Sequence, residues 1–148
     1  MKVLSLRQPY AELIVSGKKT IESRLWATKF RGEFLIHAGM NVSLGACKRF
    51  GFDPENLTKG AVVGKAVLIS VKEYLTDEDY LKDSDKHFGS KEGLEEFGWS
   101  GKKKYGFVLE NVERVNPPIS LKGQLGFFNY LLEDEKAKNI NLFLKEKS

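Results

Sequence analysis

The sequence predicts an α+β domain, in which short helices flank a small β-barrel or a covered sheet. Residues 33–38, 61–71 and 105–115 are predicted strands, because their apolar residues alternate or run continuously. The segment at 33–38 is apolar on both faces, which is typical of a central strand that is covered on both sides. The helical segments between the strands are short and begin at capping residues.

Composition indicates one globular domain. The chain has 148 residues, of which 41% are hydrophobic and 30% charged, and it shows no internal repeat or low-complexity linker. We therefore predict a single domain over residues 1–148, with an insertion at 83–98 and a C-terminal helix or arm at 131–148. The formal net charge of +4 permits a phosphate-bearing partner but does not require one.

Several function classes have no local support in the sequence. Cys47 is the only cysteine, which excludes an intrachain disulfide, and two histidines are too few for a typical zinc site. There is no GxxxxGK[ST] phosphate loop, no GxGxxG, no HExxH and no GxSxG. We therefore expect no metal and no cofactor. No apolar run is long enough for a signal peptide or a membrane span, so we expect a cytoplasmic protein.

The chain begins with a predicted strand and a helix. Residues 3–6 are apolar and are predicted to form the strand. Pro9 suits the first position of a helix, and Gly17 suits its C-terminal end. Lys18 falls near the negative end of the helix dipole, where a cation is mildly stabilised.

The residues after this helix change to an alternating pattern. Alternation places Glu22 and Arg24 on the same face of a second strand. Ideal alternation turns Lys19 to the other face. Lys19 therefore reaches the same cleft as Glu22 and Arg24 only if the backbone bulges or twists just after Gly17.

Later elements are predicted from their boundaries. Ser43 is expected to cap a helix that ends at Gly51, and Thr76 is expected to cap another. Gly64 lies inside the apolar strand at 61–71 and predicts a bulge or a close backbone approach. The Asn-Pro-Pro segment at 116–118 is predicted to end the strand that begins at residue 105.

Charged and aromatic residues cluster around the junction between the first helix and the second strand. Arg and Lys suit phosphate, Gln reads base edges, and Tyr offers a stacking face. This composition predicts a cleft for a flexible or single-stranded nucleic acid, or for one flipped nucleotide. The predicted nucleic-acid-binding residues are Gln8, Tyr10, Lys19, Arg24, Trp26 and Lys122.

The same residues permit acid–base chemistry. A partly buried lysine has a lowered pKa and can act as a base or nucleophile, and a glutamate beside it can relay a proton. If the protein is an enzyme, Lys19 and Glu22 are the predicted catalytic residues. The residues alone do not separate binding from catalysis. An adaptor that binds a protein partner through its aromatic residues is a third alternative.

Several motifs occur together along the chain. They are Leu-Ser-Leu-Arg-Gln-Pro-Tyr at 4–10, Gly-x-Lys-x-x-Glu-x-Arg at 17–24, and Arg-Gly at 31–32, preceded by Trp26 and Thr28. Tyr-Gly-Phe-Val-Leu-Glu-Asn at 105–111 and Lys-Gly-x-x-Gly-Phe at 122–127 follow. With these motifs the sequence resembles the ASCH domain family, a branch of the PUA-like superfamily.

The resemblance implies a PUA-like small mixed β-barrel flanked by short helices, with a cleft lined by residues 17–24. ASCH members are proposed to bind RNA or other nucleic acids. One bacterial subgroup hydrolyses acetylated cytidine with a lysine that aligns with Lys19, where a threonine stands in place of Glu22, and a ribonuclease activity is also reported. We therefore predict a module whose partner is RNA, another nucleic acid or a nucleoside. The alternative is a small hydrolase acting on acetylated cytidine nucleosides or RNA.

Overall fold

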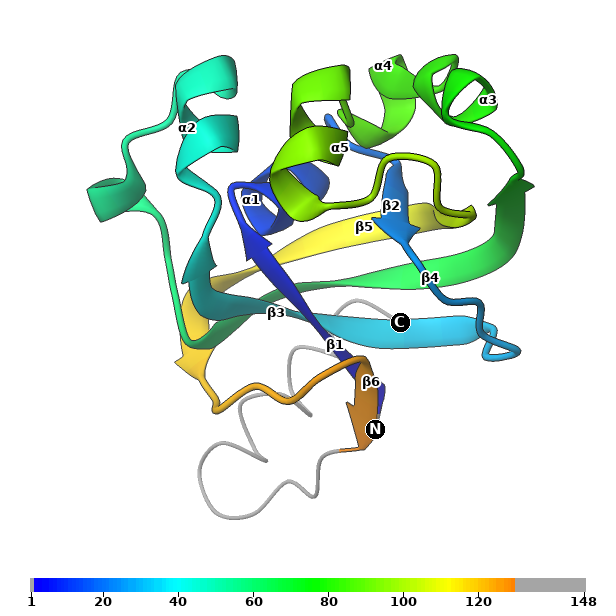
Figure 1. The fold of residues 1–148 in the computed structure, drawn as a ribbon. Coiled ribbons are helices and arrows are strands. Elements are labelled where there is room, and N and C mark those ends of the chain that lie inside the picture. The colour runs from blue at the N-terminus through cyan, green and yellow to red at the C-terminus, as the bar shows by residue number, and fades with distance from the viewer. Residues whose placement is uncertain (1, 130–148) are drawn as a thin grey trace.

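The computed structural model describes residues 2–129, and its centre is a six-stranded sheet (Figure 1). The strand order is β2-β5-β4-β3-β1-β6, in which β1 and β3 are parallel and the other neighbours are antiparallel. The strands are β1 (Lys2–Gln8), β2 (Ile21–Arg24), β3 (Gly32–Val42), β4 (Ala61–Tyr74), β5 (Lys104–Ser120) and β6 (Phe127–Asn129). The predicted α+β class is confirmed. The C-terminal helix or arm predicted at 131–148 lies outside the described residues.

Short helices connect the strands. They are α1 (Tyr10–Val15), α2 (Leu44–Phe50), the 3-10 helix η1 (Pro54–Asn56), α3 (Asp77–Leu81), α4 (Ser84–His87) and α5 (Lys91–Phe97). α1 packs against four strands, β1, β3, β4 and β5. Figure 1 shows α2 to α5 gathered along one side of the molecule, with β6 on the other. Within the described part of the chain, no helix has the length and apolar character needed to cross a membrane.

Apolar side chains cover both faces of the sheet. Phe34 and Ile36 of β3 point into a core that Ile14 of α1 also joins. Leu35 points to the opposite face, where a second cluster forms. Its other members are Val3, Val62, Val115, Ile119, Leu121 and Phe128. The prediction that the strand at 33–38 is central and covered on both sides is therefore confirmed.

The prediction of a closed β-barrel is wrong. Closure would require β2 to pair with β6, and these two strands are instead the edges of the sheet. Side chains fill the space between the edges. The Trp26 ring, shortly after β2, has its centroid 5.2 Å from that of Phe107 in β5 and 6.0 Å from that of Phe127 in β6. The chain just after β2 therefore meets β6 through a ring contact, without backbone pairing between the two edges.

The predicted helix boundaries are largely confirmed. Ser43 accepts a backbone hydrogen bond at the start of α2, and Gly51 ends that helix with φ 76°. Thr76 caps α3 in the same way. α1 begins at Tyr10, one residue later than predicted, and Pro9 takes the N-cap position.

The prediction that Asn-Pro-Pro ends β5 is wrong, because this strand continues to Ser120. Its register with β4 shifts between Arg114 and Ile119, so the prolines lie in a bulge where no ladder N–H is required. Gly64 stands opposite this irregularity, as its predicted bulge requires. A Cβ at Gly64 would overlap the Glu113 carbonyl, which explains why glycine is needed there.

Candidate functional site

A cleft of about 910 Å³ lies between the helices and the sheet. Its walls come from β1, β2, the end of β3, the segment from α3 to the residues just after α5, and the loop after β5. Ligand-binding clefts commonly measure ~300–1,000 Å³. The cleft therefore has the size of a ligand site and is assembled from segments far apart in the sequence.

The end of α1 sets the position of Lys19. Gly17 has φ 84°, its N–H donates to the Ile14 carbonyl, and the Lys18 N–H donates to the Leu13 carbonyl. This pair of hydrogen bonds is a Schellman motif, which turns the chain sharply after a helix. The Lys19 N–H also donates to the Leu13 carbonyl, and β2 begins only two residues later. Because Lys19 precedes β2, the alternation of strand side chains does not determine the direction of its side chain. The backbone turn after Gly17, which Lys19 was predicted to require to reach the cleft, is present.

Lys19, Glu22 and Arg24 form one ion cluster in the wall of the cleft. Lys19 Nζ lies 3.0 Å from Glu22 Oε1, and Arg24 Nη2 lies 2.9 Å from Glu22 Oε2. Lys19 also donates to the His87 carbonyl at 2.9 Å. Arg24 Nη2 donates to the Ser5 carbonyl at 2.9 Å. The ion cluster thereby joins the start of β2 to the end of α4 and to β1.

Burial and pairing together set the charges in this ion cluster. Lys19 is 2% exposed and Glu22 is 6% exposed. Burial lowers the pKa of Lys19, and the charge and hydrogen bond of Glu22 oppose that shift. Burial alone would raise the pKa of Glu22, but the charges and hydrogen bonds of Lys19 and Arg24 outweigh it and lower the pKa. Glu22 is therefore a carboxylate at neutral pH, held by two cations.

Arg24 is the member of the ion cluster that faces the open cleft. Its side chain is 20% exposed, and within residues 2–129 no hydrogen bond uses its Nη1 or Nε. Nε is buried and does not face the cleft. A guanidinium has five N–H donors, so the two on Nη1 remain for an anion. The Lys19 ammonium is already directed at Glu22 and the His87 carbonyl. It also lies 5.2 Å from the centroid of the Tyr10 ring.

The loop after β5 brings Lys122 to the cleft. His37 Nε2–H donates to the Leu121 carbonyl at 2.6 Å, and His37 Nδ1 accepts from the Ser5 hydroxyl at 2.9 Å. Burial lowers the pKa of His37, which keeps the ring in this neutral form. A Cβ at Gly123 would lie 2.6 Å from the His37 ring, so glycine lets the loop pack closely. Lys122 itself is exposed and lines the cleft.

His87 and Tyr80 are site residues that sequence reasoning missed. Their rings stack with centroids 3.9 Å apart, and the Tyr80 hydroxyl lies 2.8 Å from that of Ser23 in β2. His87 Nδ1 accepts from the Gly89 N–H and Nε2–H donates to the Tyr80 carbonyl, so the ring is neutral. Burial lowers the pKa of His87 to about 4. No local motif marks these residues, because only the packing of α3 and α4 beside β2 brings them to the cleft.

The structure places most of the predicted binding residues together. Those that line the cleft are Tyr10, Lys19, Arg24 and Lys122, and the second predicted catalytic residue, Glu22, lines it too. Gln8 lies outside the cleft: its Oε1 accepts from the Glu12 N–H at the start of α1, and its Nε2 donates to the Thr58 carbonyl. Trp26 also lies outside it, with its ring centroid 5.9 Å from Arg24 Cζ.

The cleft lining is basic and partly aromatic. Its cations are Arg7, Lys19, Arg24 and Lys122, and Glu22 is the one carboxylate among the described lining residues. Because two of the cations already neutralise Glu22, the rest of the lining favours an anion. Tyr10, Phe97 and Trp99 add partly exposed rings. Within residues 2–129, no three His, Cys, Asp or Glu side chains are grouped so as to hold a metal ion.

Glu22→Gln is expected to destabilise the fold by about 3–5 kcal/mol, because it leaves the buried Lys19 ammonium beside Arg24 without a carboxylate. Glu12→Gln is the matched control. Glu12 and Arg114 form a surface pair with side chains 29% and 44% exposed, for which we expect a loss of at most about 1 kcal/mol. Urea unfolding at pH 7.5 measures both variants, and equal losses would contradict a buried charge network.

The low pKa of His87 predicts a loss of stability in mild acid. In the unfolded chain, His87 takes up a proton near pH 6.5, whereas in the folded protein it does so only near pH 4. The stabilisation from His87 is therefore complete above about pH 6.5 and falls as the pH drops toward 4, by about 2 kcal/mol between pH 7.5 and 5. Urea unfolding across this range should show a shallower pH slope for His87→Gln than for the wild type. Equal pH slopes for the wild type and His87→Gln would contradict the low pKa of His87 in the folded protein.

Comparisons with known proteins identify the family. The sequence matches the family model described as ASCH domain over residues 4–119. The fold is similar to the crystal structure of ASCH from Zymomonas mobilis, with a TM-score of 0.66 and 20% identity over 95% of this chain and 93% of that one. A point mutant of that protein gives a TM-score of 0.67 at 19% identity, over 97% and 96% of the two chains. A search of curated proteins gave no match. Because the family model spans most of the sequence, this chain belongs to the ASCH domain family.

Proposed function

We propose that this protein is a nucleic-acid-binding module, with RNA as its partner, that holds one nucleotide in the cleft. The observation that carries the proposal is the excess of cations in a cleft whose one described carboxylate is already neutralised. Phosphate is the anion that arginine and lysine recognise on nucleic acids. Membership of the ASCH domain family supports RNA, because ASCH members are proposed to bind RNA or other nucleic acids.

In this proposal, Arg24 and Lys122 contact phosphate. Arg24 retains the donors of Nη1 within the described structure, and Lys122 is exposed at the cleft. Lys19 has a different role from the phosphate contact that its residue type first indicated. Its ammonium is 2% exposed and bonded to Glu22. Lys19 therefore acts as a positioning residue that holds Glu22 and, through it, Arg24.

The base of the bound nucleotide is proposed to contact Tyr10. This ring is partly exposed in the cleft and lies next to the Lys19 ammonium. Aromatic stacking is worth ~1–3 kcal/mol per base and tolerates any base. Gln8 is left out of the proposed contacts, because both ends of its amide are bonded within the protein.

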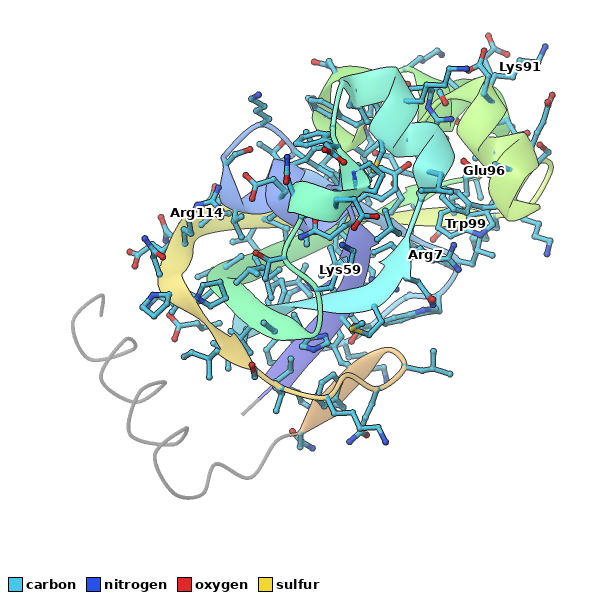
Figure 2. The ribbon with its side chains drawn as sticks, turned by 90° about the vertical axis from the view of Figure 1, so that its left-hand side faces the viewer. Arg7, Lys59, Lys91, Glu96, Trp99 and Arg114 are labelled. Carbon is cyan, nitrogen blue, oxygen red and sulfur yellow. The ribbon has the colours of Figure 1, made fainter. Side chains whose placement is uncertain are left out.

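Arg24→Gln and Lys122→Gln are each expected to weaken RNA binding and reduce its salt dependence. Each lost phosphate contact should lower the slope of log affinity against log salt by about 0.7 for a single strand. Fluorescence anisotropy of a labelled RNA oligonucleotide, titrated with KCl, measures this slope. Lys91→Gln is the matched control, since Lys91 is exposed at the start of α5 and lies outside the cleft (Figure 2). Absence of salt-sensitive binding by the wild type to any RNA or DNA would overturn the proposal.

A second candidate function, hydrolysis of acetylated cytidine nucleosides or RNA, is supported by one observation. Lys19 is a buried lysine with a lowered pKa in the wall of a cleft, and Glu22 Oε1 lies 3.0 Å from its Nζ. A lysine must lose a proton to act as a base or nucleophile, and burial favours that loss. Glu22 is placed to relay this proton.

If hydrolysis is the function, Lys19→Met should abolish turnover of acetylated cytidine or RNA, because methionine has no amine. Lys18→Met is the matched control: Lys18 is exposed in the turn after α1 and does not line the cleft. Activity should rise with pH through the lowered pKa of Lys19, as more of the amine is neutral. Product formation measured by chromatography tests this. An inactive wild type, or an active Lys19→Met variant, would contradict it.

A further inference from the structure

The proposed phosphate and base contacts leave one end of the cleft unused. This end is formed by Arg7 of β1, by Phe97 at the end of α5 and by Trp99 just after it. Figure 2 shows Arg7 and Trp99 near each other on the side of the molecule where α5 lies. We define these residues as the outer patch. Arg7 is exposed, and the two aromatic residues are partly exposed.

The geometry of the outer patch follows from the end of α5. Gly98 ends the helix with φ 70°, and this turn brings the Trp99 N–H to the Leu94 carbonyl at 2.8 Å. The rings of Phe97 and Trp99 consequently lie side by side, with centroids 6.0 Å apart. Arg7 Cζ lies 5.3 Å from the Phe97 centroid. The outer patch is thus two neighbouring rings with a guanidinium over one of them.

The outer patch continues directly into the inner part of the cleft. The Phe97 centroid lies 6.4 Å from that of Tyr10, and the Tyr10 centroid lies 5.2 Å from Lys19 Nζ. Aromatic faces therefore run from the ion cluster to the rim. A ligand that is held at Arg24 and extends along this row reaches Phe97 and Trp99 next.

The charge of the outer patch indicates what occupies it. Within residues 2–129, Arg7 forms no ion pair and no hydrogen bond through its side chain, and its described side-chain interaction is with the Phe97 ring. Bases stack on aromatic rings and on arginine planes, and arginine also meets the adjacent phosphate. An exposed guanidinium over one of two partly exposed rings provides both contacts. An apolar peptide would leave the Arg7 charge without a partner.

We propose that Arg7, Phe97 and Trp99 form a second nucleotide subsite, which stacks the base next to the one held in the cleft. This inference rests on the proposed nucleic-acid-binding function and names its ligand more closely. The ligand is a single strand with two neighbouring unpaired nucleotides, because bases in a duplex have their faces covered by their neighbours. A free nucleotide fills the inner part of the cleft only.

The test compares the four homopentameric RNAs with the four nucleoside monophosphates. Trp99→Leu keeps apolar packing against the cluster of Tyr74, Tyr80 and Leu94 but removes the stacking face. Arg7→Gln changes an exposed side chain, so it tests the subsite without disturbing the core. Lys48→Gln, on the exposed surface of α2, is the control for lost charge. Urea unfolding verifies that each variant is folded.

We expect Trp99→Leu and Arg7→Gln each to weaken pentamer binding about tenfold and to leave monophosphate binding unchanged. Pentamers, but not monophosphates, should quench the fluorescence of Trp99, and Trp99→Leu should abolish that quenching. Unchanged pentamer binding in both variants would overturn the subsite while leaving the proposed function intact. Equal losses for pentamers and monophosphates would also overturn it. If the wild type binds no pentamer and no monophosphate, the proposed function itself fails.

Discussion

A buried carboxylate held between two cations is the interaction on which the cleft depends. A charged group inside a protein is stable only when it is paired and hydrogen-bonded. Glu22 meets this condition through Lys19 on one oxygen and Arg24 on the other. Lys19 also donates a hydrogen bond to the His87 carbonyl, and Arg24 donates one to the Ser5 carbonyl. The charges that shape the cleft therefore also connect three separate segments of the fold.

Lys19 and Arg24, the two cations that hold Glu22, differ in their exposure to the cleft. Lys19 is 2% exposed, and in the proposed binding function it positions Glu22 rather than contacting the ligand. Arg24 is 20% exposed and retains donors within the described structure. The distinction matters for function, since a binding site needs the free donors of Arg24, whereas a hydrolase needs Lys19 to lose its proton beside Glu22. The two proposed functions thus require different protonation states of Lys19 in one ion cluster.

Local patterns in the sequence predicted part of this site. Alternation placed Glu22 and Arg24 on one face, and Gly17 marked the end of α1, because both features depend on residues close together in the chain. The side taken by Lys19 could not be predicted, since it depends on where β2 begins after the Schellman motif. The role of His87 was also missed, because it depends on packing between segments more than sixty residues apart.

Residue type alone suggested a binding role for two side chains that are held by contacts within the protein. Gln8 has the chemistry of a base reader, yet it binds the start of α1 and the Thr58 carbonyl. Trp26 has the chemistry of a stacking residue, yet it fills the space between the edges of the sheet against Phe127. Whether such a side chain faces a ligand or packs within the protein depends on long-range contacts, which the periodicity of the sequence does not show.

The most direct test is a crystal structure of this protein with a short single-stranded RNA. We predict a phosphate at Arg24 and Lys122, with Lys19 still bonded to Glu22 and to the His87 carbonyl. RNA bound on another face, or a Lys19 ammonium released from Glu22 to contact the RNA, would contradict the account.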